Sequence, residues 1–311
     1  MTNPQKPSAN RETQAVKIAR IAGDVSTMKA DEAGTLAFIS RVLVQAFLPH
    51  SNPEKAVWTR KNGDFTLTLK SGFEGSDTGE PIFFGLPYGT IPRLLLAWLN
   101  SEVLINAQDK ENQNPRVINL GRSLSDFIEK IGLVSATGGR NGSITRFKKQ
   151  AERLFRSEIS VVCTGENYLS EHDIKVSDGR FFFWNVKNPR QETFWESYIE
   201  LSERFYNLIT KTPVPLDYRI LRAIKQSPMA LDLYMWLTHR MSYLNKPVVI
   251  KWETLQQQLG SDVERIDNFR AKVRHHLKKI RAFWDDLNID ASKSDGIYLY
   301  PTRSLISPTK A

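Results

Sequence analysis

Positive charge is concentrated in two short segments of this 311-residue chain. The segment from Arg140 to Arg156 holds six Lys and Arg residues against one acid, and the segment from Arg265 to Arg281 holds seven against one. Together the two segments carry a net charge of +11, whereas the whole chain carries +9 and the remainder therefore −2. Basic side chains grouped in this way neutralise phosphates, so the pattern predicts a nucleic-acid interface.

Both segments also have the periodicity of amphipathic helices. At about 100° per residue, apolar side chains gather on one side and basic side chains on the other. In the first helix the apolar stripe consists of Phe147, Ala151, Leu154 and Phe155. In the second helix it consists of Ile266, Phe269, Val273, Leu277, Ile280 and Trp284. We therefore expect two helices that each bury one face and present the other to DNA.

The candidate DNA-binding residues lie on, or just before, these basic faces. Arg pairs best with guanine and Asn or Gln with adenine, whereas Lys suits phosphates. In the first segment the candidates are Arg140, Asn141, Ser143, Arg146, Lys148, Lys149 and Arg153, with Gln150 as a further base-contacting side chain. In the second segment they are Arg265, Asn268, Arg270, Lys272, Arg274, His275, Lys278 and Lys279. The sequence leaves open which of them reach bases rather than phosphates.

Each basic helix occupies the same place in a repeated series of elements. The first half predicts a helix at 94–103, a strand at 117–120, a helix at 123–131, the basic helix at 143–156, and a hairpin of 159–162 with 180–184. In the second half a helix at 216–226 precedes the series, which is helix 230–243, strand 248–252, helix 253–259, basic helix 263–284, and a hairpin of 287–291 with 297–300. This order is typical of a helix-turn-helix followed by a β wing. The predicted fold is therefore α+β, with two tandem winged-helix domains.

The remaining segments are assigned around these two repeats. Residues 1–25 are predicted to be a disordered N-terminal tail, 26–190 the N-terminal winged-helix domain with a preceding helix and β-hairpin, and 191–311 the C-terminal winged-helix domain. Apolar spacing predicts the preceding helix at 31–48, and Asn62-Gly63 predicts a hairpin of 56–59 with 65–69. The segment 194–209 fits either a strand or a helix.

Other chemistry finds less support in the sequence. The glycine-rich run from Thr137 to Ser143 lacks the lysine of a nucleotide-binding P-loop. A nicking enzyme would need paired metal-binding histidines, which the positions His50, His172, His239, His275 and His276 do not offer. Cys163 is the only cysteine, and no apolar run approaches the roughly 20 residues of a membrane span. We expect a cytoplasmic protein that is not an enzyme, binds no cofactor or metal, and does not contact membranes.

Four blocks resemble a known family. They are YGTIPRLLLAWL from Tyr88, LGRSLSDF from Leu120, TGGRNGSI from Thr137 and QAERLF from Gln150. Together they resemble the RepA replication initiators of plasmids, in the group defined by a shared C-terminal RepA region, and the likeness extends from about Phe84 to Tyr300.

The resemblance implies a non-enzymatic initiator that binds repeated sequences, or iterons, in double-stranded plasmid origin DNA. It also implies recruitment of host replication proteins, namely the host initiator and the replicative helicase, with control of plasmid copy number. It leaves open the operator sequence, the role of a homodimer and repression of its own gene. The alternative is a winged-helix repressor or plasmid-maintenance factor that does not initiate replication.

Overall fold

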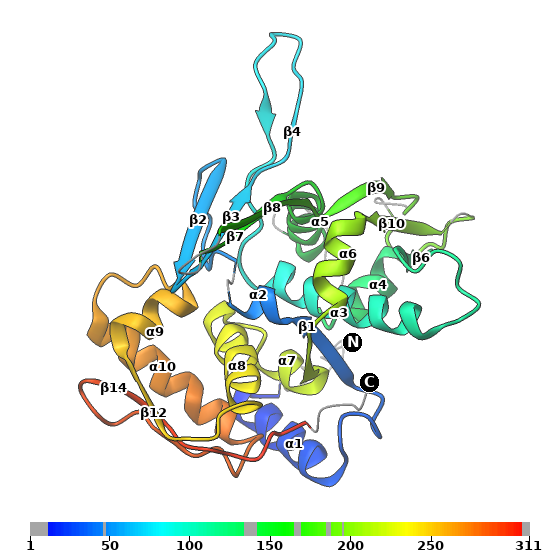
Figure 1. The fold of residues 1–311 in the computed structure, drawn as a ribbon. Coiled ribbons are helices and arrows are strands. Elements are labelled where there is room, and N and C mark those ends of the chain that lie inside the picture. The colour runs from blue at the N-terminus through cyan, green and yellow to red at the C-terminus, as the bar shows by residue number, and fades with distance from the viewer. Residues whose placement is uncertain are drawn as a thin grey trace, which may run out of the picture.

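A computed structural model of the protein describes residues 12–45, 48–133, 142–164, 169–184, 188–194 and 196–306. Helices and strands are mixed throughout, which confirms the α+β class. Buried apolar side chains form one cluster that extends through both halves of the chain. Figure 1 shows the two halves side by side, with the green elements of the first half beside the yellow and orange elements of the second.

Most of the described part of the predicted N-terminal tail is helical. α1 (Gln14–Thr27) starts at Thr13, whose hydroxyl accepts a hydrogen bond from the Val16 N–H at 3.4 Å. The Gln14 side-chain amide donates to the Ala223 carbonyl at 2.9 Å. Residues 14–25 are therefore helical and not disordered, because contacts with a segment far along the chain stabilise them. Residues 1–11 of the predicted tail lie outside the described residues.

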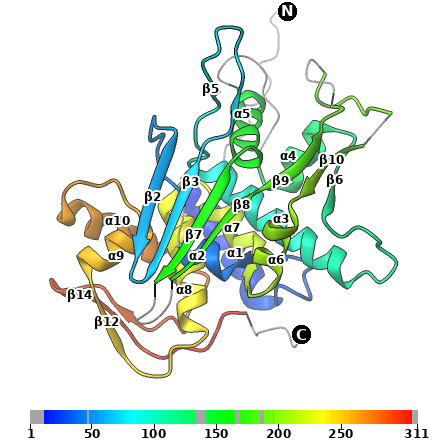
Figure 2. The same cartoon turned by 45° about the horizontal axis from the view of Figure 1, so that its top comes forward.

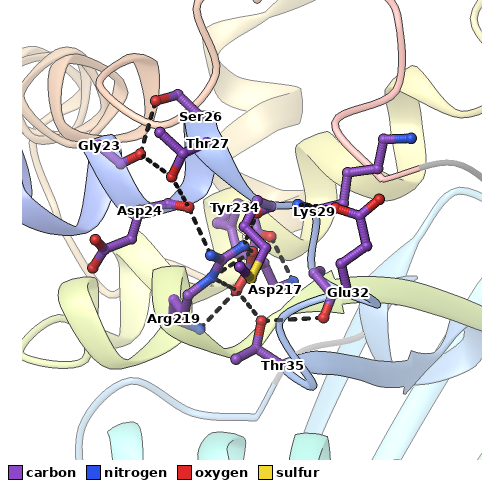
Figure 3. Close-up of polar contacts among 12 residues, drawn as sticks. Gly23, Asp24, Ser26, Thr27, Lys29, Glu32, Thr35, Asp217, Arg219 and Tyr234 are labelled. Carbon is purple, nitrogen blue, oxygen red and sulfur yellow. Dashed lines mark hydrogen bonds and ion pairs between the residues drawn. The ribbon is translucent and has the colours of Figure 1, made fainter.

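A half-buried arginine fixes the end of α1, as Figure 3 shows. The Arg219 guanidinium donates to the carbonyl oxygens of Asp24 at 2.8 Å and Met28 at 2.7 Å. It also pairs with the Asp217 carboxylate at 2.7 Å, and the Asp217 backbone N–H donates to the Tyr234 hydroxyl at 3.0 Å. The N-terminal helix is therefore anchored to the second half of the molecule.

The helix predicted at 31–48 is wrong. The structure has β1 (Leu36–Ser40) followed by the short helix α2 (Arg41–Gln45). β1 pairs antiparallel with β11 (Pro213–Asp217). Helical spacing of apolar residues cannot reveal this pairing, because the strand that supplies the hydrogen bonds is distant in sequence.

Two hairpins follow, and the second projects from the molecule. β2 (Val57–Asn62) pairs with β3 (Phe65–Lys70), which confirms the hairpin predicted around Asn62-Gly63. β4 (Phe73–Glu74) then pairs with β5 (Ile82–Phe83). Residues 72–85, which we call the arm, extend away from the body in both Figure 1 and Figure 2.

The first repeat contains a set of six elements that we call the first unit. They are α3 (Thr90–Gln108), β6 (Val117–Gly121), α4 (Leu124–Lys130), α5 (Ser143–Phe155), β9 (Ser177–Phe181) and β10 (Ser197–Leu201). Their sheet has the order β6-β10-β9. β10 lies beyond the boundary that we predicted at residue 190, so the first unit extends further along the chain than expected.

The hairpin predicted between 159–162 and 180–184 is wrong. β7 (Glu158–Thr164) pairs with β8 (Leu169–Lys175) and with β3, in a sheet of order β2-β3-β7-β8. In this register Val161 lies opposite Leu67 and Ile159 opposite Leu69, and all four side chains are buried. The apolar face of β3 therefore provides a better partner for β7 than β9 does.

The second repeat contains the corresponding six elements, the second unit. They are α8 (Pro228–Met241), β12 (Val248–Lys251), α9 (Trp252–Leu259), α10 (Ile266–Arg281), β13 (Ile289–Asp290) and β14 (Gly296–Leu299). The sheet order β12-β14-β13 is the same as in the first unit, because the last strand again lies between the other two. α6 (Glu203–Thr210) and α7 (Tyr218–Ile224) precede this unit, so the open segment 194–209 contains both a strand and a helix.

Candidate nucleic-acid interface

α5 presents three of the predicted cations to solvent. Phe147 and Leu154 bury the opposite face of the helix, at 1% and 0% exposure. Arg146, Lys148 and Lys149 are exposed, and none of their side chains forms a hydrogen bond or ion pair with a residue in the described part of the chain. An exposed cation without an internal partner is available to a phosphate or a base.

The start of α5 is described only in part. Ser143, the first residue of the helix, is half-buried and has an interaction of its own. Arg140 and Asn141 lie outside the described residues.

Arg153 and Gln150, which we predicted to face DNA, lie in the interior. Arg153 is 7% exposed, and its guanidinium donates to the carbonyl oxygens of Phe84 at 2.9 Å and Leu86 at 3.1 Å. Gln150 is 6% exposed and accepts a hydrogen bond from the Tyr88 N–H at 2.9 Å. A helical wheel places both side chains away from the apolar stripe, but it cannot show that the segment after the arm covers that side.

α10 presents a longer basic face. Six predicted residues on this helix or directly before it are exposed or half-buried, and their side chains form no hydrogen bond or ion pair within the described ranges: Arg265, Asn268, Lys272, His275, Lys278 and Lys279. The opposite face is buried through Phe269 and Val273, both at 0% exposure. The separation of the two faces agrees with the predicted amphipathic pattern.

Two arginines of α10 are bound to the turn between β13 and β14. Arg270 donates to the Ser294 carbonyl at 2.9 Å and forms an ion pair with Asp267. Arg274 donates to the carbonyls of Ala291 at 2.6 Å and Ser292 at 3.1 Å. Both guanidinium groups therefore hold the turn against the helix, a role that we did not predict for them.

The turn adds a cation that the sequence reasoning missed. Lys293 is exposed at the tip of the turn, next to the residues that Arg274 holds. The sequence could have indicated Lys293, because the hairpin of 287–291 with 297–300 was predicted correctly and this lysine lies between its strands. The first unit differs here, because β9 ends in the exposed residues Phe181, Phe182 and Phe183.

In each unit the end of the helix before the basic helix is capped by an arginine from elsewhere in the chain. In the first unit Arg222 of α7 donates to the Lys130 carbonyl at 2.9 Å and packs against Gly132, which has a φ of +77°. In the second unit Arg60 of β2 donates to the Gln257 carbonyl and packs against Gly260, which has a φ of +59°. Any larger residue at either glycine would collide with the arginine and would have an unfavourable backbone conformation.

A buried ion pair joins the two units. Arg93 of α3 donates to the Asp232 carboxylate of α8 at 2.6 Å and 2.7 Å, and His50 contacts the same carboxylate at 2.8 Å. Burial alone would raise the pKa of Asp232, but the Arg93 charge and the hydrogen bonds from His50 and Arg93 hold it below its usual value. α3 and α8 occupy equivalent places in the two repeats, so this contact fixes one repeat against the other.

Other chemistries find little support among the described residues. No three His, Cys, Asp or Glu side chains come together there as a metal site would require. His276 contacts the Ser227 hydroxyl at 3.1 Å, and burial lowers its pKa to about 4, with smaller contributions from Lys279 and His275. No described helix combines the length and apolar character that a bilayer crossing demands.

The comparisons with known proteins give one family. A family model described as plasmid-encoded RepA protein matches residues 86–254, from just before α3 to the start of α9. No curated protein and no solved structure matches the chain.

Proposed function

Because the chain belongs to the plasmid-encoded RepA family, we propose that it is a plasmid replication initiator that binds double-stranded origin DNA. The family places the chain in plasmid replication. Binding to repeated origin sequences, or iterons, is the activity that we infer from its surface.

Each unit acts as a winged helix in this proposal. Both units have the order helix, strand, helix, helix, strand, strand, apart from β7 and β8, which follow α5 in the first unit and belong to another sheet. Both three-stranded sheets place the last strand in the middle. In a helix-turn-helix the second of the two adjacent helices enters the major groove. α5 and α10 occupy that place, so they are the recognition helices of the first and second unit.

The observation on which the proposal depends is the set of unpartnered cations on these two helices. Arg146, Lys148 and Lys149 on α5, and Lys272 and Lys278 on α10, are exposed and have no partner among the described residues. Equivalent helices of two repeats therefore present positive charge to solvent, while the chain outside the two basic segments is slightly acidic. This distribution suits a duplex that is contacted at two places.

The family also supports a role that requires other proteins. We infer that the bound initiator recruits the host initiator and the replicative helicase, and that it performs no covalent chemistry of its own.

Arg270 and Arg274 contribute to the proposed DNA binding indirectly, because they hold the β13–β14 turn, and with it Lys293, beside α10.

Two experiments test the proposal. Footprinting of purified protein on the DNA that flanks its gene should show protection of directly repeated sites. A plasmid with only that DNA as origin should replicate when the protein is supplied and fail without it. Protection without protein-dependent replication would favour the repressor or plasmid-maintenance factor instead. Absence of protection on any flanking segment would contradict DNA binding itself.

A further inference from the structure

The arm is chemically unlike the rest of the chain. Between Gly72 and Gly85 it holds three acids, Glu74, Asp77 and Glu80, and no Lys or Arg. Its charge of −3 compares with +12 for all other residues. An acidic hairpin is repelled by DNA phosphates, so the arm is not a further DNA-binding element.

The arm also exposes large apolar side chains. Phe73, Ile82 and Phe83 are 64%, 52% and 51% exposed. The rings of Phe73 and Phe83 contact each other edge to face, with centroids 6.2 Å apart. Apolar side chains gathered on a projecting, two-stranded hairpin are typical of a surface that binds another protein.

The base of the arm is held firmly. The Phe84 N–H donates to the Gly72 carbonyl at 3.0 Å, and Arg153 donates to the Phe84 carbonyl at 2.9 Å. The Arg156 guanidinium lies 3.9 Å from the centroid of the Phe84 ring. The end of α5 therefore fixes the direction in which the arm projects.

A groove at the other end of the molecule has the opposite charge. It is lined by α1, the end of α4, and α7, and its lining holds five Lys and Arg residues against two acids. Three of the cations, Lys17, Arg222 and Lys225, donate hydrogen bonds to backbone carbonyls. None of these three forms an ion pair with a carboxylate in the described part of the chain. Burial, and then the nearby charges of Lys17 and Arg222, lower the pKa of Lys225 to about 8. Carboxylates brought into the groove would neutralise this excess of positive charge.

The apolar lining of the groove comes from Ile21, which is 7% exposed, and Leu133, which is half-buried. Figure 1 shows the arm at the top of the molecule and α1 at the bottom, so the arm cannot reach the groove of its own chain. A second copy of the chain can bring the two surfaces together.

We propose that the arm of one copy binds the groove between α1, α4 and α7 of the next copy, in a head-to-tail contact. Glu74 and Glu80 would approach Lys17 and Lys225, while Phe73 and Phe83 would cover Ile21 and Leu133. The two surfaces differ, so the contact is heterologous and can repeat from copy to copy. Such a contact suits proteins that lie side by side on directly repeated sites, but it needs no DNA to form.

The test uses sedimentation velocity of the full chain without DNA, at low ionic strength. We expect the natural protein to show species larger than a monomer that decrease as salt is added, because salt screens the charges. The arm variant E74K/E80K and the groove variant K17M/K225M should each be monomeric. A second arm variant, F73S/F83S, should also lose the association without any change in charge.

Mixing the two charge variants distinguishes a head-to-tail contact from a symmetric one. One protein then has an intact arm and the other an intact groove, so we expect a dimer in the mixture and nothing larger. The control E111K/E171K, matched to the arm variant, makes the same change of charge at exposed sites away from both surfaces and should associate like the natural protein. Circular dichroism checks that each variant is folded.

Three results would overturn the proposal: a natural protein that stays monomeric at all concentrations, arm variants that still associate, or a mixture that forms no dimer. A monomeric natural protein would leave a foreign basic protein as the occupant to seek for the arm. Footprinting of single sites by the arm variant separates this proposal from the proposed function. The variant can protect a single site on DNA even when copies of the protein no longer bind one another.

Discussion

The two units share an order of elements but use their basic helices differently. α10 presents a continuous basic face and binds its inward arginines to the turn of its own sheet, which exposes Lys293. α5 exposes fewer cations, and its Arg153 holds the arm instead. The corresponding strand of the first unit ends in exposed phenylalanines. The comparison teaches that similar basic helices can divide their cations between exposed positions and structural contacts, and that α10 has the more basic exposed face of the two helices.

The largest effect should come from the pair that joins the units. Arg93→Met leaves the fully buried Asp232 without its main partner, and three backbone carbonyls lose a donor. We expect a loss of about 5 kcal/mol in the free energy of unfolding, the upper end for a broken buried pair. Denaturant unfolding measures it. The double variant R93M/D232L should recover much of the loss, and a single variant as stable as the natural protein would show that the pair does not join the units.

Removing the core of either unit should have the next largest effect. Phe147 and Phe269 are at most 1% exposed and occupy equivalent places on α5 and α10. Replacing either by Ala should cost roughly 4 kcal/mol. Because one apolar cluster extends through both units, we expect a single unfolding transition, lowered in each variant. Two separate transitions, of which only one moves, would show instead that the units unfold independently.

The sequence predicted the repeated elements well and their partners less well. Periodicity located α5 and α10 because Phe147 and Phe269 lie on clear apolar stripes, and Asn62-Gly63 located the β2–β3 turn. The pairing of β1 with β11 and of β7 with β3 was missed, since these partners are distant in sequence. The pairing of β7 with β8 was also missed, although β8 follows β7 directly. Arg153 was placed on the wrong side because the segment that covers it comes from another part of the chain. Local patterns determine helices, whereas tertiary contacts determine which cations remain exposed.

Acid should destabilise the second unit through a histidine that the first unit lacks. The pKa of His276 is about 4 in the folded protein, below its ordinary value of 6.5. The unfolded chain therefore takes up a proton more readily, and stability is lost as the pH falls from 6.5 towards 4. The loss at pH 4 is about 2–3 kcal/mol. His276→Gln should reduce the pH dependence of unfolding. Some pH dependence should remain, because burial lowers the pKa of His239 as well. An unchanged pH profile would contradict the assignment.

The smallest effect should come from the turn beside α10. Arg274→Ala removes the hydrogen bonds to Ala291 and Ser292, which should cost roughly 1 kcal/mol and speed amide exchange in that turn. Lys293→Ala is the matched control, because it removes a cation at the same turn without breaking those bonds. Equal exchange rates in the two variants would show that Arg274 does not hold the turn.

The central claim, that α5 and α10 both contact the same duplex, is tested most directly by the salt dependence of DNA binding. The variants R146A/K149A and K272A/K278A are titrated with the protected flanking DNA at several salt concentrations. The control K110A/K246A removes two exposed lysines elsewhere. Each lost phosphate contact lowers the slope of log affinity against log salt by about 1, so each test variant should lower it by up to about 2 while the control leaves it unchanged. A correctly folded variant of either helix that binds with unchanged affinity and slope would contradict the account.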